Sequence, residues 1–297
     1  MKNKTKICIA YVGESVSDGT MDVNELAPAL LALSNLIAES NKILNQNNSI
    51  VGVRLSSHIE RGSFEMTLEI VHSFAEQLKS WFIGSDYSLE EILNYIGLTA
   101  TLSRLTLIQL YRWIKERKIK KVDQLNKNTV KIYVDNESKE ISIGLSKLFF
   151  SYNIQKHLES VLYPLKKDGV EVFEIRDTST QESIEKISDN ELDIFTLKRN
   201  ENTEEKVSKQ IMRLKIKRIS FERGSKWKFD DGDSTFVADV KDENFLNEVI
   251  SGNFSFSQSD EIEAEIEFHQ QFVNGLLKKS YKIVTKILKF VKVYAKD

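Results

Sequence analysis

The sequence predicts an α+β protein in which an N-terminal strand–helix–β-hairpin unit leads into a helical middle, and a small antiparallel β-barrel-like module forms the C-terminus. Apolar and polar residues alternate strictly over residues 64–70 and again over residues 261–268. A period of two with one apolar side is typical of an antiparallel strand with one dry face and one wet face. Between residues 26 and 44, by contrast, leucine and isoleucine recur at helical spacing. The two periods together predict the α+β class.

The N-terminal half is expected to begin with a buried strand at residues 7–12, which contains Cys8. A polar loop follows, and Asp22 is the expected N-cap of the first helix because its carboxylate can accept hydrogen bonds from the first turn. Pro28 falls in the first turns of that helix, where proline is tolerated. The further elements expected here are a hairpin at 51–59 and 64–71 with its turn at 60–63, helices at 73–83, 88–119 and 146–165, a hairpin at 129–134 and 140–143, and a strand at 170–175.

A domain boundary is expected inside residues 177–209, an acidic and polar connection between domains at 1–176 and 210–297. Early in the second domain, the apolar alternation slips by one residue after Ile216. Such a slip indicates one extra residue in a strand, and it predicts a β-bulge near Lys217.

The second domain is expected to close, or nearly close, into a barrel, because closure removes exposed strand edges. Residues 230–233 contain Asp-Gly between two aromatic strands, which favours a hairpin turn over an ion site. Asp242 is the expected N-cap of a short helix. The lysine-rich segment 279–292 is expected to be a strand whose Lys282 and Lys286 face the glutamates of the preceding strand, although as a helix it would be basic and amphipathic.

The composition excludes several classes of protein. Of the 297 residues, 41% are apolar and 29% charged, which is typical of a globular chain. The 42 basic residues are balanced by 44 acidic ones, so global charge argues neither for a nucleic-acid binder nor for a polyanion mimic. One cysteine excludes an internal disulfide and a cysteine-based metal site, and no two of the four histidines have the spacing of a helical metal pair. We therefore expect no metal and no cofactor.

The longest weakly charged stretch is residues 92–111, which holds the single charge of Arg104 and precedes a basic group. Length and flank fit a membrane-spanning helix, but polar residues recur throughout it, which favours a helix buried in the protein or in an oligomer interface. The first apolar run ends at Gly13, too early for a signal peptide, so cytoplasm is the expected location. A homo-oligomer is expected, with a self-association surface at Leu98, Leu102, Leu105, Ile108 and Trp113.

The polar loop ahead of the first helix is the expected place for a small ligand. It has neither a dinucleotide-binding glycine motif nor a Gly-Lys-Ser/Thr motif, but amides that open a helix can bind an anion. The residues expected at this site are Gly13, Glu14, Ser15, Asp18, Gly19 and Asp22. A hydrolase that acts through the carboxylates among them is a further alternative, but no residue is assigned as catalytic.

Two basic clusters have the charge to contact phosphates. One is residues 112–121, which include Trp113, and the other is the run Arg213, Lys215, Lys217 and Arg218. Phosphate binding needs a patch that stays unneutralised, and acidic residues lie close to both clusters. Solvated surfaces are therefore expected at both, and a nucleic-acid partner is not favoured.

Three segments, residues 21–31, 61–65 and 226–232, resemble an uncharacterised family of bacterial and prophage proteins, a likeness that covers most of the chain. The resemblance implies a bacterial or phage setting and no catalytic residue. We expect a non-enzymatic binding or assembly protein, with a role in phage–host conflict or antiviral defence and with self-association through its central helices. The alternative is a binder that sequesters or senses a nucleotide signal, and a protein partner is also open.

Overall fold

The computed structural model describes residues 3–45, 49–56, 64–74, 87–99, 105–115, 117–197, 203–222, 224–232, 234–254, 256–257, 260–273 and 275–292. The chain forms two compact units, residues 1–199 and 200–297. Helices and strands are segregated within both, so the α+β class is confirmed.

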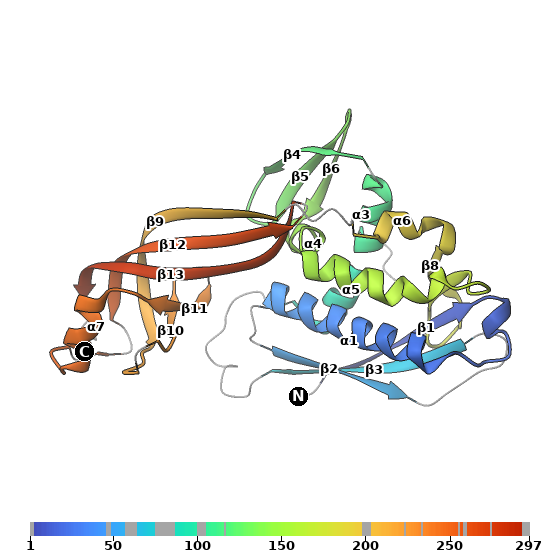
Figure 1. Ribbon diagram of the computed structural model, residues 1–297, viewed down its shortest axis with the longest axis horizontal. Helices are drawn as coiled ribbons and strands as arrows, with labels where there is room; N and C mark the ends of the chain where they lie inside the picture. The colour runs from blue at the N-terminus through green and yellow to red at the C-terminus, as the bar shows by residue number, and fades with distance from the viewer. Residues whose placement is uncertain are drawn as a thin grey trace. The chain divides into compact units, whose positions relative to one another are not determined.

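A five-stranded antiparallel sheet organises the first unit, in the strand order β2-β3-β1-β7-β8. Its strands are β1 (Asn3–Val12), β2 (Ser49–Ser56), β3 (Phe64–Phe74), β7 (Val172–Arg176) and β8 (Ser183–Ser188). Helix α1 (Val23–Asn45) lies along one face of this sheet (Figure 1). The apolar residues of β3, from Phe64 to Ile70, point into the core beneath it. The expected strand–helix–hairpin unit is confirmed, while the hairpin turn at 60–63 lies outside the described residues.

The helical middle is more broken than the periodicity predicted. A single helix at 88–119 is wrong, because α2 (Leu89–Ile96) ends at Gly97, whose φ of 99° is left-handed. Helix α3 (Leu107–Ile114) then starts afresh with Thr106 as its N-cap. The expected helix at 146–165 is likewise two helices, α4 (Ile143–Phe149) and α5 (Tyr152–Leu162), because the Ser151 side chain caps the second.

Of the helix expected at 73–83, the first two residues instead end β3, and residues 75–83 lie outside the described part. The hairpin expected next is confirmed as β5 (Thr129–Val134) and β6 (Glu137–Ser142), joined through Asp135 with a φ of 52°. Strand β4 (Ile119–Gln124) extends it to a three-stranded sheet.

The stretch expected as a polar connection belongs largely to the first unit. Strand β8 pairs with β7, and a short helix, α6 (Leu192–Phe195), follows it. Ile187 and Phe195 are fully buried in the first core, which holds this acidic segment in place despite its polar composition.

A closed five-stranded barrel forms the second unit, in the order β10-β11-β13-β12-β9. Its elements are β9 (Thr203–Arg218), β10 (Trp227–Asp230), β11 (Thr235–Val240), α7 (Glu243–Ile250), β12 (Glu261–Val273) and β13 (Leu276–Val291). All neighbouring pairs are antiparallel except β11 and β13, which run parallel. Trp227, Phe229 and Ile262 fill the interior. The barrel prediction is therefore confirmed, with one parallel pair that was not foreseen.

Several local predictions in the barrel are confirmed. In the β9–β10 ladder Lys228 pairs with Arg218 and Phe229 with Ile216, so Lys217 is the extra residue of a bulge. Asp242 accepts a hydrogen bond from the amide of Phe245 and caps α7. The lysine-rich C-terminal segment is strand β13.

The expected position of one lysine on β13 is wrong. Lys286 lies opposite Glu265 in the ladder, as expected. Lys282, however, lies opposite Phe268, on the other side of the strand from the glutamate row. Its ammonium is 3.1 Å from Asp231 and 3.6 Å from the ring centre of Phe236.

Candidate functional site

The loop expected to bind an anion is folded onto the turn at Gly169. The amide of Ser15 donates to the carbonyl of Gly169 at 3.0 Å, and the amides of Val16 and Ser17 donate within the loop. A Cβ atom at Gly13 would lie 2.2 Å from the Gly169 carbonyl oxygen. Glycine is therefore required at position 13 by close packing, and these amides are occupied by protein acceptors.

The same loop presents carboxylates where a phosphate would have to approach. Asp18 accepts hydrogen bonds from the hydroxyl and the amide of Thr20, and these bonds lower the pKa of its carboxyl. Asp22 accepts from the amide of Asn24 at 2.8 Å at the start of α1. With Glu14 also in the loop and Gly19 bonded to the carbonyl of Val16, the expected residues come together but form an acidic turn. This turn repels a phosphate group.

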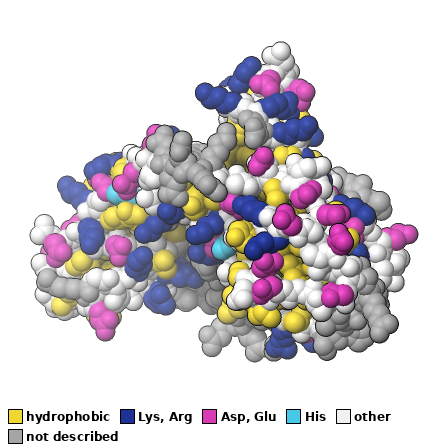
Figure 2. Space-filling model, turned by 45° about the vertical axis from the view of Figure 1, so that its right-hand side comes forward, with side chains coloured by type: hydrophobic (Ala, Val, Ile, Leu, Met, Phe, Trp, Pro, Cys, Tyr) yellow, Lys and Arg dark blue, Asp and Glu magenta, His cyan; other side chains and the backbone are white. Residues whose placement is uncertain are grey.

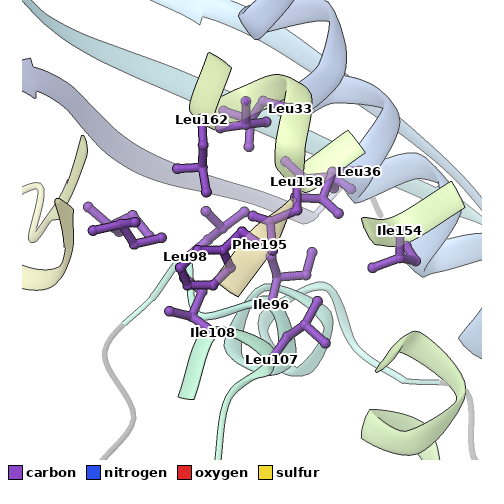
Figure 3. Close-up of a cluster of buried hydrophobic side chains, with 14 of the residues drawn as sticks. Leu33, Leu36, Ile96, Leu98, Leu107, Ile108, Ile154, Leu158, Leu162 and Phe195 are labelled. Atoms are coloured by element: carbon purple, nitrogen blue, oxygen red, sulfur yellow. The ribbon is translucent and has the colours of Figure 1, made fainter. Parts of the chain in front are cut away.

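The residues expected at a self-association surface lie mostly inside the first unit. Leu98 and Ile108 are 3% and 1% exposed, and Figure 3 shows them beside Phe195 in the core. Leu105 and Trp113 pack against that core and are partly buried. Leu102 lies outside the described residues. Because Leu98 and Ile108 are already covered by their own chain, they offer no surface to a second copy.

A buried ion network lies on the sheet face opposite α1. Arg176 contacts the carboxylates of Glu65 and Glu174 at 2.5 and 2.7 Å, and Lys186 contacts Glu174 at 2.8 Å. Burial alone would raise the pKa of Glu174, but hydrogen bonds from Lys186 and Arg176 outweigh it, so the pKa lies below its usual value. Cations contact both carboxylates, and we assign this network to stability.

The basic cluster at 112–121 is partly neutralised, because Arg112, Arg117 and Lys121 are paired with acidic neighbours. Arg112 contacts Glu185 at 2.5 Å and Glu191 at 2.7 Å, which raises the pKa of the guanidinium against the opposing effect of burial. Lys121 contacts Asp123 at 2.7 Å. Figure 2 shows basic and acidic side chains intermixed on the three-stranded sheet at the top of the view. The expectation of a solvated surface therefore agrees with the contacts made here.

The second basic cluster is different at its C-terminal end. Arg213 contacts Glu261 at 2.5 Å, and Lys217 contacts Asp230 at 3.1 Å. Arg218, by contrast, lies directly opposite Lys228 in the β9–β10 ladder. Like charges directly opposite each other in a ladder are destabilising.

This like-charged pair faces outward because of the bulge and the barrel core. Phe229 and Ile216, the next pair in the ladder, point into the barrel and are nearly fully buried. The bulge at Lys217 restores the alternation, so Arg218 is exposed and Lys228 half-buried on the outer surface. In the part of the chain that the structure describes, neither forms an ion pair.

Two further features are close to the pair, one along the chain and one in the ladder. The loop from β9 to β10 carries Phe221, 62% exposed, and the exposed Lys226. On the other side, Lys228 lies opposite Val237 of β11, which is 47% exposed. We call Arg218, Phe221, Lys226, Lys228 and Val237 the outer β9–β10 face. Asp239 is the neighbouring acid on β11, one alternation beyond Val237.

Most of this face was missed by sequence reasoning. The basic run 213–218 was considered as a phosphate contact, but Lys226, Lys228, Phe221 and Val237 were assigned to no site. The available signal was the alternation of Lys226 and Lys228 with the buried Trp227 and Phe229, which places both lysines outward.

A groove with a volume of about 610 Å³ lies between α7 and β13. Its rim carries Lys241, Lys286 and Lys289, balanced by Asp242, Glu243 and Glu248. Asp242 is also occupied, because its second oxygen accepts from the amide of Ile287 at 2.8 Å. The balanced rim does not select an anion.

These features define the second unit as a small closed barrel whose outer β9–β10 face carries two cations, Arg218 and Lys228, without an ion-pair partner among the described residues. In comparisons with known proteins, no family model, no curated protein and no solved structure matches the chain. Among the described helices, none combines the length and apolarity needed to cross a bilayer.

Proposed function

We propose that the protein is a non-enzymatic nucleic-acid-binding protein whose outer β9–β10 face contacts the phosphate backbone. The observation that supports this most directly is the opposition of Arg218 and Lys228. Two cations held side by side destabilise the free barrel, and a phosphate placed between them turns that repulsion into two charge-assisted hydrogen bonds.

The connectivity of the barrel supports the same proposal. If β9 to β13 are counted as strands one to five, the barrel closes in the order 1-2-3-5-4. Helix α7 lies between strands three and four (β11 and β12), and strands three and five (β11 and β13) are parallel. Five-stranded barrels of the oligonucleotide/oligosaccharide-binding type have this arrangement and bind along the face of their second and third strands. Fold alone does not establish function, so the argument depends on Lys228 and its neighbours on this face.

The nearly neutral composition of the chain does not oppose the proposal. Binding to a polyanion depends on the charge of the local patch, and ion pairs elsewhere engage other basic residues, among them Arg112, Lys121 and Arg213. The proposal keeps the expected binding function and places it on the barrel, away from the loop at 13–22.

Fluorescence anisotropy with a labelled 20-nucleotide oligonucleotide at several salt concentrations tests this proposal. The double variant Arg218→Ala/Lys228→Ala should bind more weakly, and its plot of log affinity against log salt should be shallower by about 1.4, because each lost phosphate contact removes about 0.7 from the slope on a single strand. Lys127→Ala, in an exposed turn of the first unit, is the matched control. An unchanged slope in the double variant would contradict the proposal.

A further inference from the structure

Strand β9 has a long edge that lacks a partner strand. It pairs with β12 along residues 203–215, but with β10 only along residues 215–218. Within the described part of the chain, no strand pairs with residues 203–213 on the β10 side. Strands β9, β12 and β13 therefore continue beyond β10 as a three-stranded ribbon (Figure 1). We call residues 203–213 the β9 edge.

The β9 edge is open to solvent and carries apolar as well as charged side chains. Residues 203–211 are all exposed, with Val207 at 51% and Ile211 at 64%. The N–H and C=O groups of alternate residues on an edge strand point away from the sheet and can pair with a further strand. Charged side chains protect many such edges from pairing, so the pattern of charge decides which strand this edge can accept.

The charges of the β9 edge complement a second copy of the same edge. When two identical strands pair antiparallel about a two-fold axis, the residue at the axis lies opposite its own copy. With Val207 at the axis, each Glu205 lies opposite a Lys209, and the two valines meet. With Lys206 at the axis two ammonium groups would meet, and with Ser208 there each Val207 would lie opposite a Lys209.

We infer that the protein associates with a second copy of itself by antiparallel pairing of the two β9 edges, with Val207 at the two-fold axis. The pairing joins the two ribbons into one continuous sheet. The Lys209 ammonium, 2.9 Å from Glu267 of its own chain, then lies between that carboxylate and Glu205 of the second copy. At the axis, Val207 lies opposite His269, which stacks on Tyr281 with ring centres 4.8 Å apart, so the same row meets itself across the interface. This inference does not depend on the proposed function.

Light scattering during size-exclusion chromatography, on the full chain free of nucleic acid and at low salt, tests the inference. The mass should rise from one chain towards two between low-micromolar and near-millimolar concentrations. Glu205→Lys leaves only cations opposite one another and Lys209→Glu only carboxylates, so each variant should weaken self-association by at least about tenfold. Lys206→Glu is the matched control, because it makes the same charge change as Lys209→Glu but would lie opposite Ser208.

The two single variants combined give the sharpest measurement. Mixed in equal amounts, Glu205→Lys and Lys209→Glu should form a mixed dimer, because every charged pair at that interface again has opposite signs. The double variant Glu205→Lys/Lys209→Glu should associate with itself for the same reason.

Three results would overturn the inference. The first is a native protein that keeps the mass of one chain at every concentration. The second is self-association of either single variant at native strength, and the third is failure of the two variants to associate when mixed. Thermal unfolding should show that each variant keeps a folded barrel, because the side chains of Glu205 and Lys209 are 61% and 60% exposed.

Discussion

Lys228→Glu gives the sharpest test of the outer β9–β10 face, because it should stabilise the barrel while removing its binding function. In the native ladder Lys228 lies opposite Arg218, so the substitution converts a like-charged pair into an oppositely charged one. Residues retained for binding at the expense of stability are common at functional sites. If Lys228 served only to maintain the fold, its substitution would lower the stability of the barrel.

The magnitude follows from the ladder geometry. An opposite-charge cross-strand pair stabilises by roughly 0.2–1 kcal/mol, and a directly opposed like pair destabilises. Since Arg218 is exposed and Lys228 only half-buried, solvent screening limits the gain in unfolding free energy from Lys228→Glu to about 0.5–1 kcal/mol. For a domain of this size that corresponds to a rise in Tm of about 2–8 °C.

Differential scanning calorimetry at 20 mM and at 1 M NaCl measures this effect on the barrel transition. The gain should be present at low salt and nearly vanish at high salt, because exposed charges are screened within about 3 Å at 1 M. Fluorescence anisotropy with the labelled 20-nucleotide oligonucleotide should show loss of binding in the same variant. Lys127→Glu, which makes the same change in net charge, should leave the Tm of the barrel and the binding of the oligonucleotide unchanged. A lower Tm for Lys228→Glu at low salt, or a gain that persists at 1 M, would refute the reasoning.

Three further predictions concern the first unit. Arg176→Met should lower the free energy of unfolding by about 3–5 kcal/mol in urea titrations, because it leaves the buried carboxylates of Glu65 and Glu174 without this cation; a loss below 1 kcal/mol would show that the network is dispensable. The pKa of Glu174 is lower in the folded state than its usual value, so its contribution to stability is present at neutral pH and lost as pH falls through the folded pKa; Glu174→Gln should therefore flatten the decline of stability below the usual pKa of a glutamate, and an unaltered acid profile would contradict the assignment. Gly13→Ala should destabilise by about 1–3 kcal/mol, because the new methyl would lie 2.2 Å from the Gly169 carbonyl oxygen; urea unfolding that matches the native protein would show that this turn yields without strain.

Local features of the chain were predictable from the sequence because each depends on residues that are neighbours along it. The alternation in β3 and in β12 predicted strands with one buried face, and both are present. The slip after Ile216 predicted the bulge, and a carboxylate at position 242 predicted the helix cap.

The prediction of one long helix at 88–119 followed the period of the apolar residues and passed over two local signals, a helix stop at Gly97 and a helix start at Thr106. A helical period runs across Gly97, yet α2 ends there, because glycine accepts the left-handed conformation and Thr106 starts a new helix. The same stretch suggested a surface for self-association, but a period shows only that one side of a helix is buried. It does not show whether the covering atoms belong to the same chain, as they do around Leu98 and Ile108.

The candidate site depended on contacts that the sequence does not contain. The amino-acid order determined which side chains of β9 and β10 alternate outward, but not that Arg218 would lie opposite Lys228, nor that Lys228 would lie opposite Val237. Register between strands is decided by closure of the barrel, in which a parallel β11–β13 pair joins segments more than 40 residues apart. Periodicity is a property of neighbouring residues, whereas the charge that a strand faces is a property of its partner, and only the tertiary structure supplies that partner.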